Sequence, residues 1–264
     1  MSSTIPSPSI VSPGAASSGI VSSGTQQVVM VDTSCANISS LKFAMERLGY
    51  EVLVSADTQV INQADKVLLP GVGSAAAAMA QIRAKGLVEC LQNLQQPVLG
   101  ICLGMQLMTN RSEEANAKGQ TVPCLGLVDT EVNAMKNNTA GELLAVETES
   151  SSNSTASTLS HKPNATQNLR LPHMGWNQVT GPAGNTSDSS LSDSPLFYGI
   201  DENTYFYFVH GYCVPTGKHT LATCDYTKPF SAAIQNGNFM GVQFHPERSG
   251  EAGAKLLRNF VELV

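Results

Sequence analysis

The sequence predicts an α/β fold with a doubly wound, mostly parallel central sheet and helices on both of its faces. Continuous apolar runs, such as residues 28–31 and 98–101, are typical of parallel strands that are buried on both faces. Segments with helical spacing lie between these runs, and this β-α-β order favours a parallel sheet. Hydrophobic residues make up 42% of the 264 residues, which is enough for a sizeable core.

The first half of the chain supplies most of the expected parallel strands. Apolar runs predict them at residues 28–31, 52–54, 67–69 and 98–101. After the first strand, apolar residues recur at helical spacing from Ile38 to Leu48, and Gly49 is the expected end of that helix. A second, alanine-rich helix is expected after the Pro-Gly-Val-Gly break at residues 70–73.

The second half predicts closely spaced strands and a final helix. Strands at residues 205–209, 232–234 and 241–244 lie near enough in sequence to suggest hairpins. The last helix is expected at roughly residues 250–263. It would place Ala254, Leu257, Phe260 and Val261 on one face.

Polar, low-complexity regions predict the domain organisation. Residues 1–26 are rich in Ser, Gly and Pro and are expected to form a disordered tail, followed by one domain at residues 27–264. Residues from about 133 to 168 are rich in Asn, Ser and Thr and predict a largely mobile insertion in that domain. A second, shorter polar stretch covers residues 181–194.

Charge and cysteine usage exclude several functional classes. The formal net charge is −6, only 14% of residues are charged, and no Lys or Arg precedes Lys42. We therefore expect no nucleic-acid partner and no membrane patch or span. The absence of a basic leader and the scattered cysteines favour a cytoplasmic protein with reduced thiols. Without a C-x-x-C pair, a zinc site has little support.

The segment Gly100-Ile101-Cys102-Leu103-Gly104 is the strongest chemical signal. It is the cysteine version of a nucleophile elbow, in which a strand ends at the nucleophile and a helix begins behind it. The helix N-terminus favours thiolate over thiol, and the N–H of Leu103 would point at a developing oxyanion. The alternative is a buried cysteine in a glycine-rich βα turn.

Two further segments follow predicted strands. His245 and Glu247 fit a base and its orienting carboxylate for the thiol, although such a pair alone more often lies on a solvated surface. Glycines in the segment Pro70-Gly71-Val72-Gly73 would let backbone N–H groups approach a ligand. An ordinary turn is the alternative here, because the Walker phosphate-loop pattern is absent.

These three segments together resemble the signature blocks of class I glutamine amidotransferases. The blocks are PGVG at 70–73, GICLGMQ at 100–106 and GVQFHPE at 241–247, and they occur in the family's order. Within the family, the stretch LPHMGWN at 171–177 is similar to HisH-type glutaminase subunits of imidazole glycerol phosphate synthase, as are residues 32–37, 111–114, 207–210 and 248–250. The match spans roughly residues 28 to 262 and omits the insertion.

The resemblance implies a flavodoxin-like fold and roles for individual residues. The catalytic triad would be Cys102, His245 and Glu247, acting on glutamine without a metal or organic cofactor. The residues that match substrate and oxyanion positions are Gly71, Val72, Gly73, Leu103, Gln106 and Glu114. Those that match positions facing the partner, a HisF-type (β/α)8-barrel cyclase, are Trp176, Tyr207 and Arg248.

Simpler interpretations stay open beside these roles. Trp176 fits a core aromatic, Tyr207 a hydrophobic strand residue and Arg248 a solvated surface charge, while His173 and His210 fit structural histidines. At the level of function, the alternatives are an amidotransferase of another pathway, a catalytically silent interaction subunit, and a general cysteine or serine hydrolase.

Overall fold

A computed structural model describes residues 26–34, 38–137, 169–182 and 190–264. Its largest sheet has seven strands. They are β1 (Val28–Val31), β2 (Val52–Ser55), β3 (Lys66–Gly71), β4 (Val98–Cys102), β11 (Thr220–Asp225), β12 (Pro229–Asn236) and β13 (Phe239–Val242). Their order across the sheet is β11-β12-β13-β4-β3-β1-β2.

Most of this sheet is parallel. The neighbouring pairs from β13 through β4, β3 and β1 to β2 all run in the same direction. At the opposite edge, β11, β12 and β13 form an antiparallel meander. The predicted α/β fold is confirmed, and so is a hairpin that joins the strands predicted at residues 232–234 and 241–244.

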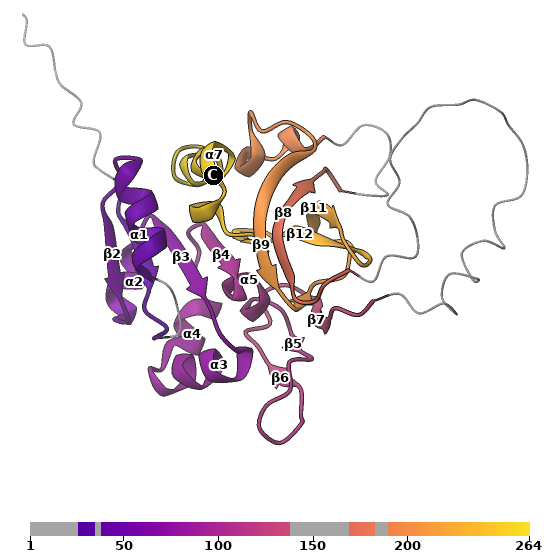
Figure 1. Cartoon of the computed structure of the whole chain (residues 1–264). Helices are drawn as coiled ribbons and strands as arrows, with labels where there is room; N and C mark the ends of the chain where they lie inside the picture. Colours follow the sequence, from indigo (N-terminus) through magenta and orange to yellow (C-terminus); the bar gives the residue numbers. More distant parts are fainter. Residues whose placement is uncertain (1–25, 35–37, 138–168, 183–189) are drawn as a thin grey trace, which may run out of the picture.

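Helices cover both faces of the sheet (Figure 1). They are α1 (Ile38–Arg47), α2 (Thr58–Gln63), α3 (Ala75–Ala84), α4 (Leu87–Gln92), α5 (Leu103–Leu107) and α7 (Gly250–Glu262). Because side chains alternate along a strand, Val28 and Met30 pack with α1 and α7, whereas Val29 and Val31 pack with α2, α3 and α4 on the other face. The continuous apolar run at residues 28–31 therefore fills two cores.

Two smaller sheets lie beside the meander. An antiparallel pair consists of β8 (His173–Val179) and β9 (Thr204–His210), and the bridge between Thr180 and Thr223 joins it to β11. The expectation that the strand near residues 205–209 forms a hairpin with the next predicted strand is therefore wrong. The other small sheet contains β5 (Arg111–Ser112), β6 (Val122–Pro123), β7 (Glu131–Ala134) and β10 (Tyr212–Cys213).

The predicted polar regions lie mostly outside the described residues. Of the tail expected at 1–26, only residue 26 is described, and 138–168 and 183–189 lie outside the description. The predicted start of the insertion is too early, because Asn133 and Ala134 belong to β7 and pair with Cys213 and Tyr212 of β10. Backbone pairing, to which the polar composition gives no clue, holds these two residues in the sheet.

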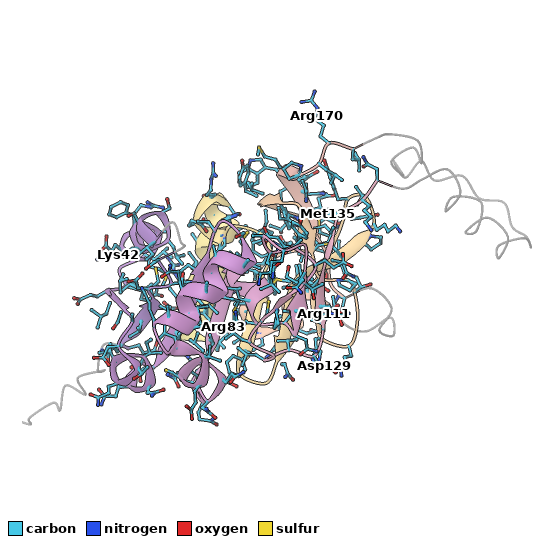
Figure 2. All side chains as sticks on the ribbon, turned by 90° about the horizontal axis from the view of Figure 1, so that it is seen from below. Lys42, Arg83, Arg111, Asp129, Met135 and Arg170 are labelled. Carbon is cyan, nitrogen blue, oxygen red and sulfur yellow. The ribbon has the colours of Figure 1, made fainter. Side chains whose placement is uncertain are left out.

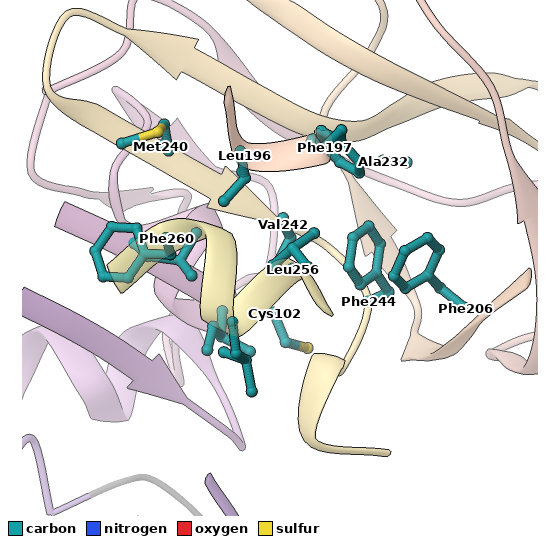
Figure 3. Close-up of a cluster of buried hydrophobic side chains, with 14 of the residues drawn as sticks. Cys102, Leu196, Phe197, Phe206, Ala232, Met240, Val242, Phe244, Leu256 and Phe260 are labelled. Atoms are coloured by element: carbon teal, nitrogen blue, oxygen red, sulfur yellow. The ribbon is translucent and has the colours of Figure 1, made fainter. Parts of the chain in front are cut away.

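An aromatic cluster packs between the sheet and α7. The rings of Phe206 and Phe244 stack with centroids 4.1 Å apart, and Phe197 meets both edge-on. Figure 3 shows Cys102 at the border of this cluster, close to Val242. The chain that carries residue 245 therefore leaves β13 from a rigidly packed position.

Surface charge is dispersed over the described part of the molecule. Figure 2 shows Lys42, Arg83, Arg111 and Arg170 on separate parts of the surface rather than in one basic patch. None of the helices within the described ranges is long and apolar enough to cross a membrane.

Candidate active site

The turn that presents Cys102 has the strand–turn–helix form expected from its sequence. Cys102 is the last residue of β4 and immediately precedes α5, and its backbone has φ 53° and ψ −109°. This conformation is unfavourable for a residue with a side chain. It is maintained by buried neighbours on both sides, and only 8% of Cys102 is exposed.

Glycines on either side of Cys102 permit this turn. A Cβ atom at Gly104 would lie 1.7 Å from the carbonyl oxygen of Leu69 in β3. A Cβ atom at Gly100 would lie 2.7 Å from the backbone nitrogen of Met105. Since real Cβ atoms do not approach so closely, both positions require glycine if α5 is to begin directly against the sheet.

His245 and Glu247 lie directly beyond β13, at the same end of the sheet as Cys102. His245 precedes the 3₁₀ helix Pro246–Arg248, and its Nδ1 lies 2.9 Å from Oε1 of Glu247. The imidazole lies close enough to Cys102 for the thiol group to influence its pKa. His245 is buried and the Glu247 side chain is only 7% exposed, so the alternative of a solvated surface pair is wrong.

The hydrogen bonds define which ring nitrogen carries a proton. Because Nδ1 faces a carboxylate that can only accept, Nδ1 is the donor, and Nε2 is the nitrogen available to the thiol. Burial alone would lower the pKa of His245. The interactions with Cys102 and Glu247 outweigh burial and raise its pKa above that of a free imidazole. The arrangement favours the imidazolium form of His245.

Strand β9 holds the His245 turn in place through its backbone. The N–H of His245 donates to the carbonyl of Tyr207 at 2.9 Å. The Ser249 hydroxyl donates to the His245 carbonyl at 2.7 Å and accepts from the N–H of Tyr207 at 3.0 Å. His245 is therefore held both by its ring and by its backbone.

A pocket of about 280 Å³ opens above these side chains. The residues from the sequence prediction that line it are Val72, Gly73, Cys102, Leu103, Gln106, Glu114, His245, Glu247 and Arg248. Gly71, Trp176 and Tyr207 do not line it. Gly71 lies behind the elbow, where a Cβ atom would come within 2.8 Å of the backbone nitrogen of Gly104. Close packing of β3 against α5, rather than access for a ligand, thus explains why residue 71 is a glycine.

Comparison with known proteins identifies the family of this chain. The family described as "Glutamine amidotransferase class-I" matches residues 29–264. The chain belongs to the class I glutamine amidotransferases.

Relatives of known function place it more narrowly. "Imidazole glycerol phosphate synthase subunit HisH" from Vibrio parahaemolyticus is 47% identical over 90% of this chain and 98% of the relative. The protein of the same name from Yersinia pseudotuberculosis is 44% identical over 89% and 99% of the two chains. The predicted resemblance to the family, and to its HisH members, is confirmed.

Solved structures agree on the fold. A "Crystal structure of glutamine amidotransferase" is similar with a TM-score of 0.56 at 16% identity, covering 89% of this chain and 97% of that one. "Structure of PurLQS from Thermotoga maritima" gives a TM-score of 0.56 at 15% identity, covering 90% and 98%. At such identities the likeness concerns the fold alone.

Two polar side chains of the amidotransferase pocket are already engaged with the protein. Gln106 is buried, and its Nε2 donates to the carbonyl of Tyr212 and to Oε1 of Gln243, both at 3.0 Å. Because both Nε2 hydrogens are used, the amide oxygen is the atom that Gln106 can offer to a ligand. Glu114 accepts the N–H of Ala75 through Oε2 at 2.5 Å, at the N-terminus of α3.

Gln243 and the segment Val209–Tyr212 also border Cys102. The sequence predicted no role for Gln243, and within the segment it predicted only that His210 is a structural histidine. Gln243 Nε2 lies 3.7 Å from the sulfur, and the carbonyl of Val209 lies 3.8 Å from it. Gln243 was within reach of sequence reasoning. It precedes His245 by two residues at the end of a strand, where alternate side chains point the same way. The segment from β9 to β10 carried no comparable signal.

His173 and His210 form a buried pair at the edge of the pocket, which His210 also lines. Nδ1 of His173 lies 2.9 Å from Nε2 of His210, and Nδ1 of His210 lies 2.8 Å from the Tyr212 carbonyl. Both histidines are buried, and His173 stacks between Phe208 and Tyr226. Burial lowers the pKa of His173 to about 4 and that of His210 to about 3. The expectation of structural histidines agrees with this arrangement.

An exposed aromatic face covers the outside of β8 and β9. Trp176 is 54% exposed, so its interpretation as a core aromatic is wrong. It meets Tyr207 edge-on, and the Arg248 guanidinium lies 4.5 Å from the centre of the Tyr207 ring. Met174 and Tyr205 are exposed on the same pair of strands. We call Met174, Trp176, Tyr205, Tyr207 and Arg248 the aromatic face.

Within the described ranges, no group of three or more His, Cys, Asp or Glu side chains is arranged to hold a metal ion.

Proposed function

We propose that this chain is the glutaminase subunit of an imidazole glycerol phosphate synthase. It hydrolyses glutamine with Cys102, His245 and Glu247 and delivers the ammonia to a HisF-type (β/α)8-barrel cyclase in histidine biosynthesis. There the ammonia is used to make imidazole glycerol phosphate and an aminoimidazole carboxamide ribonucleotide. The pathway assignment is supported by the names of the relatives and by their coverage of nearly the whole chain.

The observation that carries the chemistry is the grouping of a thiol, an imidazole and a carboxylate in one pocket. Cys102, His245 and Glu247 all line it, and Nδ1 of His245 lies 2.9 Å from Oε1 of Glu247. A thiol needs a base to become a nucleophile, and the base needs a group that fixes its tautomer. Both requirements are met by groups whose side chains are largely buried.

In the proposed reaction, the Cys102 thiolate attacks the side-chain amide carbon of glutamine. The N–H of Leu103, with one from residues 71–73, stabilises the negative oxygen of the tetrahedral intermediate. His245 gives its proton to the leaving nitrogen, so that the C–N bond breaks and ammonia and a thioester form. His245 then takes a proton from water, whose oxygen attacks the thioester. Glutamate leaves, and the thiolate and imidazolium are restored.

Glutamine recognition is assigned to Gln106 and Glu114. The substrate carries an ammonium group, which needs acceptors and favours a negative neighbour. Glu114 supplies a carboxylate on the pocket wall, and Gln106 offers its amide oxygen there. The bond from the Ala75 N–H holds Glu114 in position, so the acceptors are arranged before the substrate arrives.

The aromatic face is assigned to the cyclase. Exposed Trp, Tyr, Met and Arg side chains are the types enriched in protein interfaces. Arg248 reaches both the aromatic face and the pocket, so docking there lies next to the catalytic turn. We also propose that residues 27–264 act as one amidotransferase domain in the cytoplasm.

The decisive experiment measures glutamate release by the chain alone and with a HisF-type cyclase and its nucleotide substrate. We expect slow hydrolysis alone and strong stimulation in the complex. Cys102→Ala should abolish hydrolysis in both conditions, whereas the control Cys90→Ala, at a half-buried thiol away from the pocket, should retain it. Equal rates with and without the cyclase would contradict the pathway assignment. Full activity of Cys102→Ala would contradict the catalytic assignment.

A further inference from the structure

A chain of buried hydrogen bonds leads from a backbone carbonyl to the sulfur of Cys102. The Tyr212 carbonyl can only accept, so the amide group that faces it on Gln106 must be the NH₂ group. That same nitrogen reaches Oε1 of Gln243 at 3.0 Å. Gln243 therefore turns its own NH₂ group toward Cys102, with Nε2 at 3.7 Å from the sulfur. The Tyr212 carbonyl therefore fixes the orientation of both side-chain amides, those of Gln106 and Gln243.

Burial makes this orientation hard to reverse. Gln243 is fully buried and Gln106 is 5% exposed, so a rotated amide would face its partners without compensation from water. The Tyr212 carbonyl is itself held by His210, whose Nδ1 lies 2.8 Å away, and His210 is held by His173 at 2.9 Å. Strands β8, β9 and β10 thus anchor the chain at the end far from the sulfur.

The Gln243 donor acts on the charged form of the nucleophile. A thiolate accepts hydrogen bonds well, whereas a thiol accepts them poorly. The Val209 carbonyl also lies 3.8 Å from the sulfur and, as an acceptor, favours the protonated thiol. A donor to the sulfur offsets this preference and stabilises the thiolate.

We propose that Gln243 is a further catalytic residue that donates a hydrogen bond to the Cys102 thiolate, and that Gln106 positions it. This proposal rests on the proposed function for the identity of the nucleophile. It adds to Gln106 a task that is separate from holding glutamine. His210 and His173 complete the chain as supports of the Tyr212 carbonyl.

The test is the rate at which iodoacetamide alkylates Cys102, followed against pH by mass spectrometry without glutamine. In Gln243→Met, which keeps the length of the side chain and removes the donor, the pH of half-maximal rate should rise by about one unit. Below that pH the alkylation rate of the variant should be ~10-fold lower than that of the wild-type chain at the same pH. The other charged or titratable residues on the pocket are Glu114, His210, Tyr212, His245, Glu247 and Arg248, and all stay unchanged in this variant. An unshifted profile would overturn the proposal.

Mass spectrometry separates Cys102 from the other thiols. Burial raises the pKa of Cys90, Cys124, Cys213 and Cys224, so these should react slowly. The matched control is Gln235→Met in β12, because that amide bonds the Gly237 carbonyl away from the site. It should leave the alkylation profile unchanged.

Gln106→Met tests the orienting step. A thioether cannot donate to the Tyr212 carbonyl or to Gln243, so the Gln243 amide loses the partner that sets its direction, and no new charge enters the pocket. We expect this variant to shift the alkylation profile in the same direction as Gln243→Met, although Gln243 itself is intact. No shift in Gln106→Met would show that Gln106 does not position Gln243.

Glutamine kinetics and a measurement on the wild-type chain also test the donor role of Gln243. Gln243→Met should lower kcat about 10-fold with little change in KM, because Gln243 does not line the pocket.

In the wild-type chain with ¹⁵N-labelled glutamine side chains, the Gln243 NH₂ signal should move as Cys102 titrates, even if the variants fail to fold. A stationary signal would refute the donor role. The alkylation and NMR readouts do not depend on glutaminase activity, so their failure is distinguishable from failure of the proposed function.

Discussion

Two buried histidine sites behave in opposite ways. His245 interacts with a carboxylate and a thiol, and these partners raise its pKa. His173 and His210 bond each other and a backbone carbonyl, and burial lowers the pKa of both. Burial penalises the imidazolium in both places, so the charge of the partners decides the outcome. His245 is suited to moving protons, and the His173–His210 pair to remaining neutral.

The largest expected effect comes from removing the charge that distinguishes His245. Glu247→Gln keeps the size of the side chain but loses the negative charge, so the pKa of His245 should fall toward its ordinary value. Glutaminase kcat should drop about 100-fold. The alkaline limb of the pH–rate profile, where His245 loses its proton, should move to lower pH. The control is Glu251→Gln, an exposed carboxylate in the first turn of α7. Equal profiles for Glu247→Gln and wild type would contradict this assignment.

A smaller effect is expected from the neutral pair in acid. The folded-state pKa values of His173 and His210, about 4 and 3, lie below the unfolded value of 6.5. The unfolded chain therefore binds more protons as the pH falls below about 6.5, and stability is lost there. Each histidine should remove about 2 kcal/mol of unfolding free energy by pH 5.

Urea unfolding at pH 7 and pH 5 measures this loss. His210→Asn removes one of the two titrating groups, so its stability should change less between the two pH values than that of the wild-type chain. The same pH-dependent loss in both proteins would show that the pair is not responsible.

The smallest effect concerns the support of the His245 turn. Ser249→Ala removes the hydroxyl that bonds the His245 carbonyl and the Tyr207 N–H, which leaves that buried N–H unpaired. We expect a loss of about 1–2 kcal/mol in unfolding free energy. A few-fold fall in kcat should accompany it as the imidazole becomes less well held. Thermal unfolding and glutamate release measure both quantities, and the exposed Ser192→Ala is the reference substitution. Should kcat stay unchanged despite the lost stability, the turn does not depend on this hydroxyl.

The sequence was most informative where long apolar runs meet glycines. The parallel strands and the Cys102 elbow could be predicted, because a strand buried on both faces leaves a continuous apolar signal. The small sheet could not, since β5, β6 and β10 have two residues each and show no periodicity. Strand β11 was missed as well, because register irregularities near Ala222 break its alternating pattern.

Within the site, residue types could be predicted but not their connections. Cys102, His245 and Glu247 lie together in the pocket as the three sequence blocks suggested. Gly71 was assigned to the ligand from its motif, whereas it packs against Gly104. The contrast between His245 and His210 depends on which side chains face each ring across strands far apart in sequence. No local pattern contains that information.

The backbone at Cys102 carries an energetic cost. A φ of 53° with ψ −109° is readily adopted by glycine and resisted by every other residue, at about 1–3 kcal/mol. A glycine here would therefore make the chain more resistant to heat while removing the thiol. The protein gives up part of its stability to hold a reactive group at the mouth of the pocket.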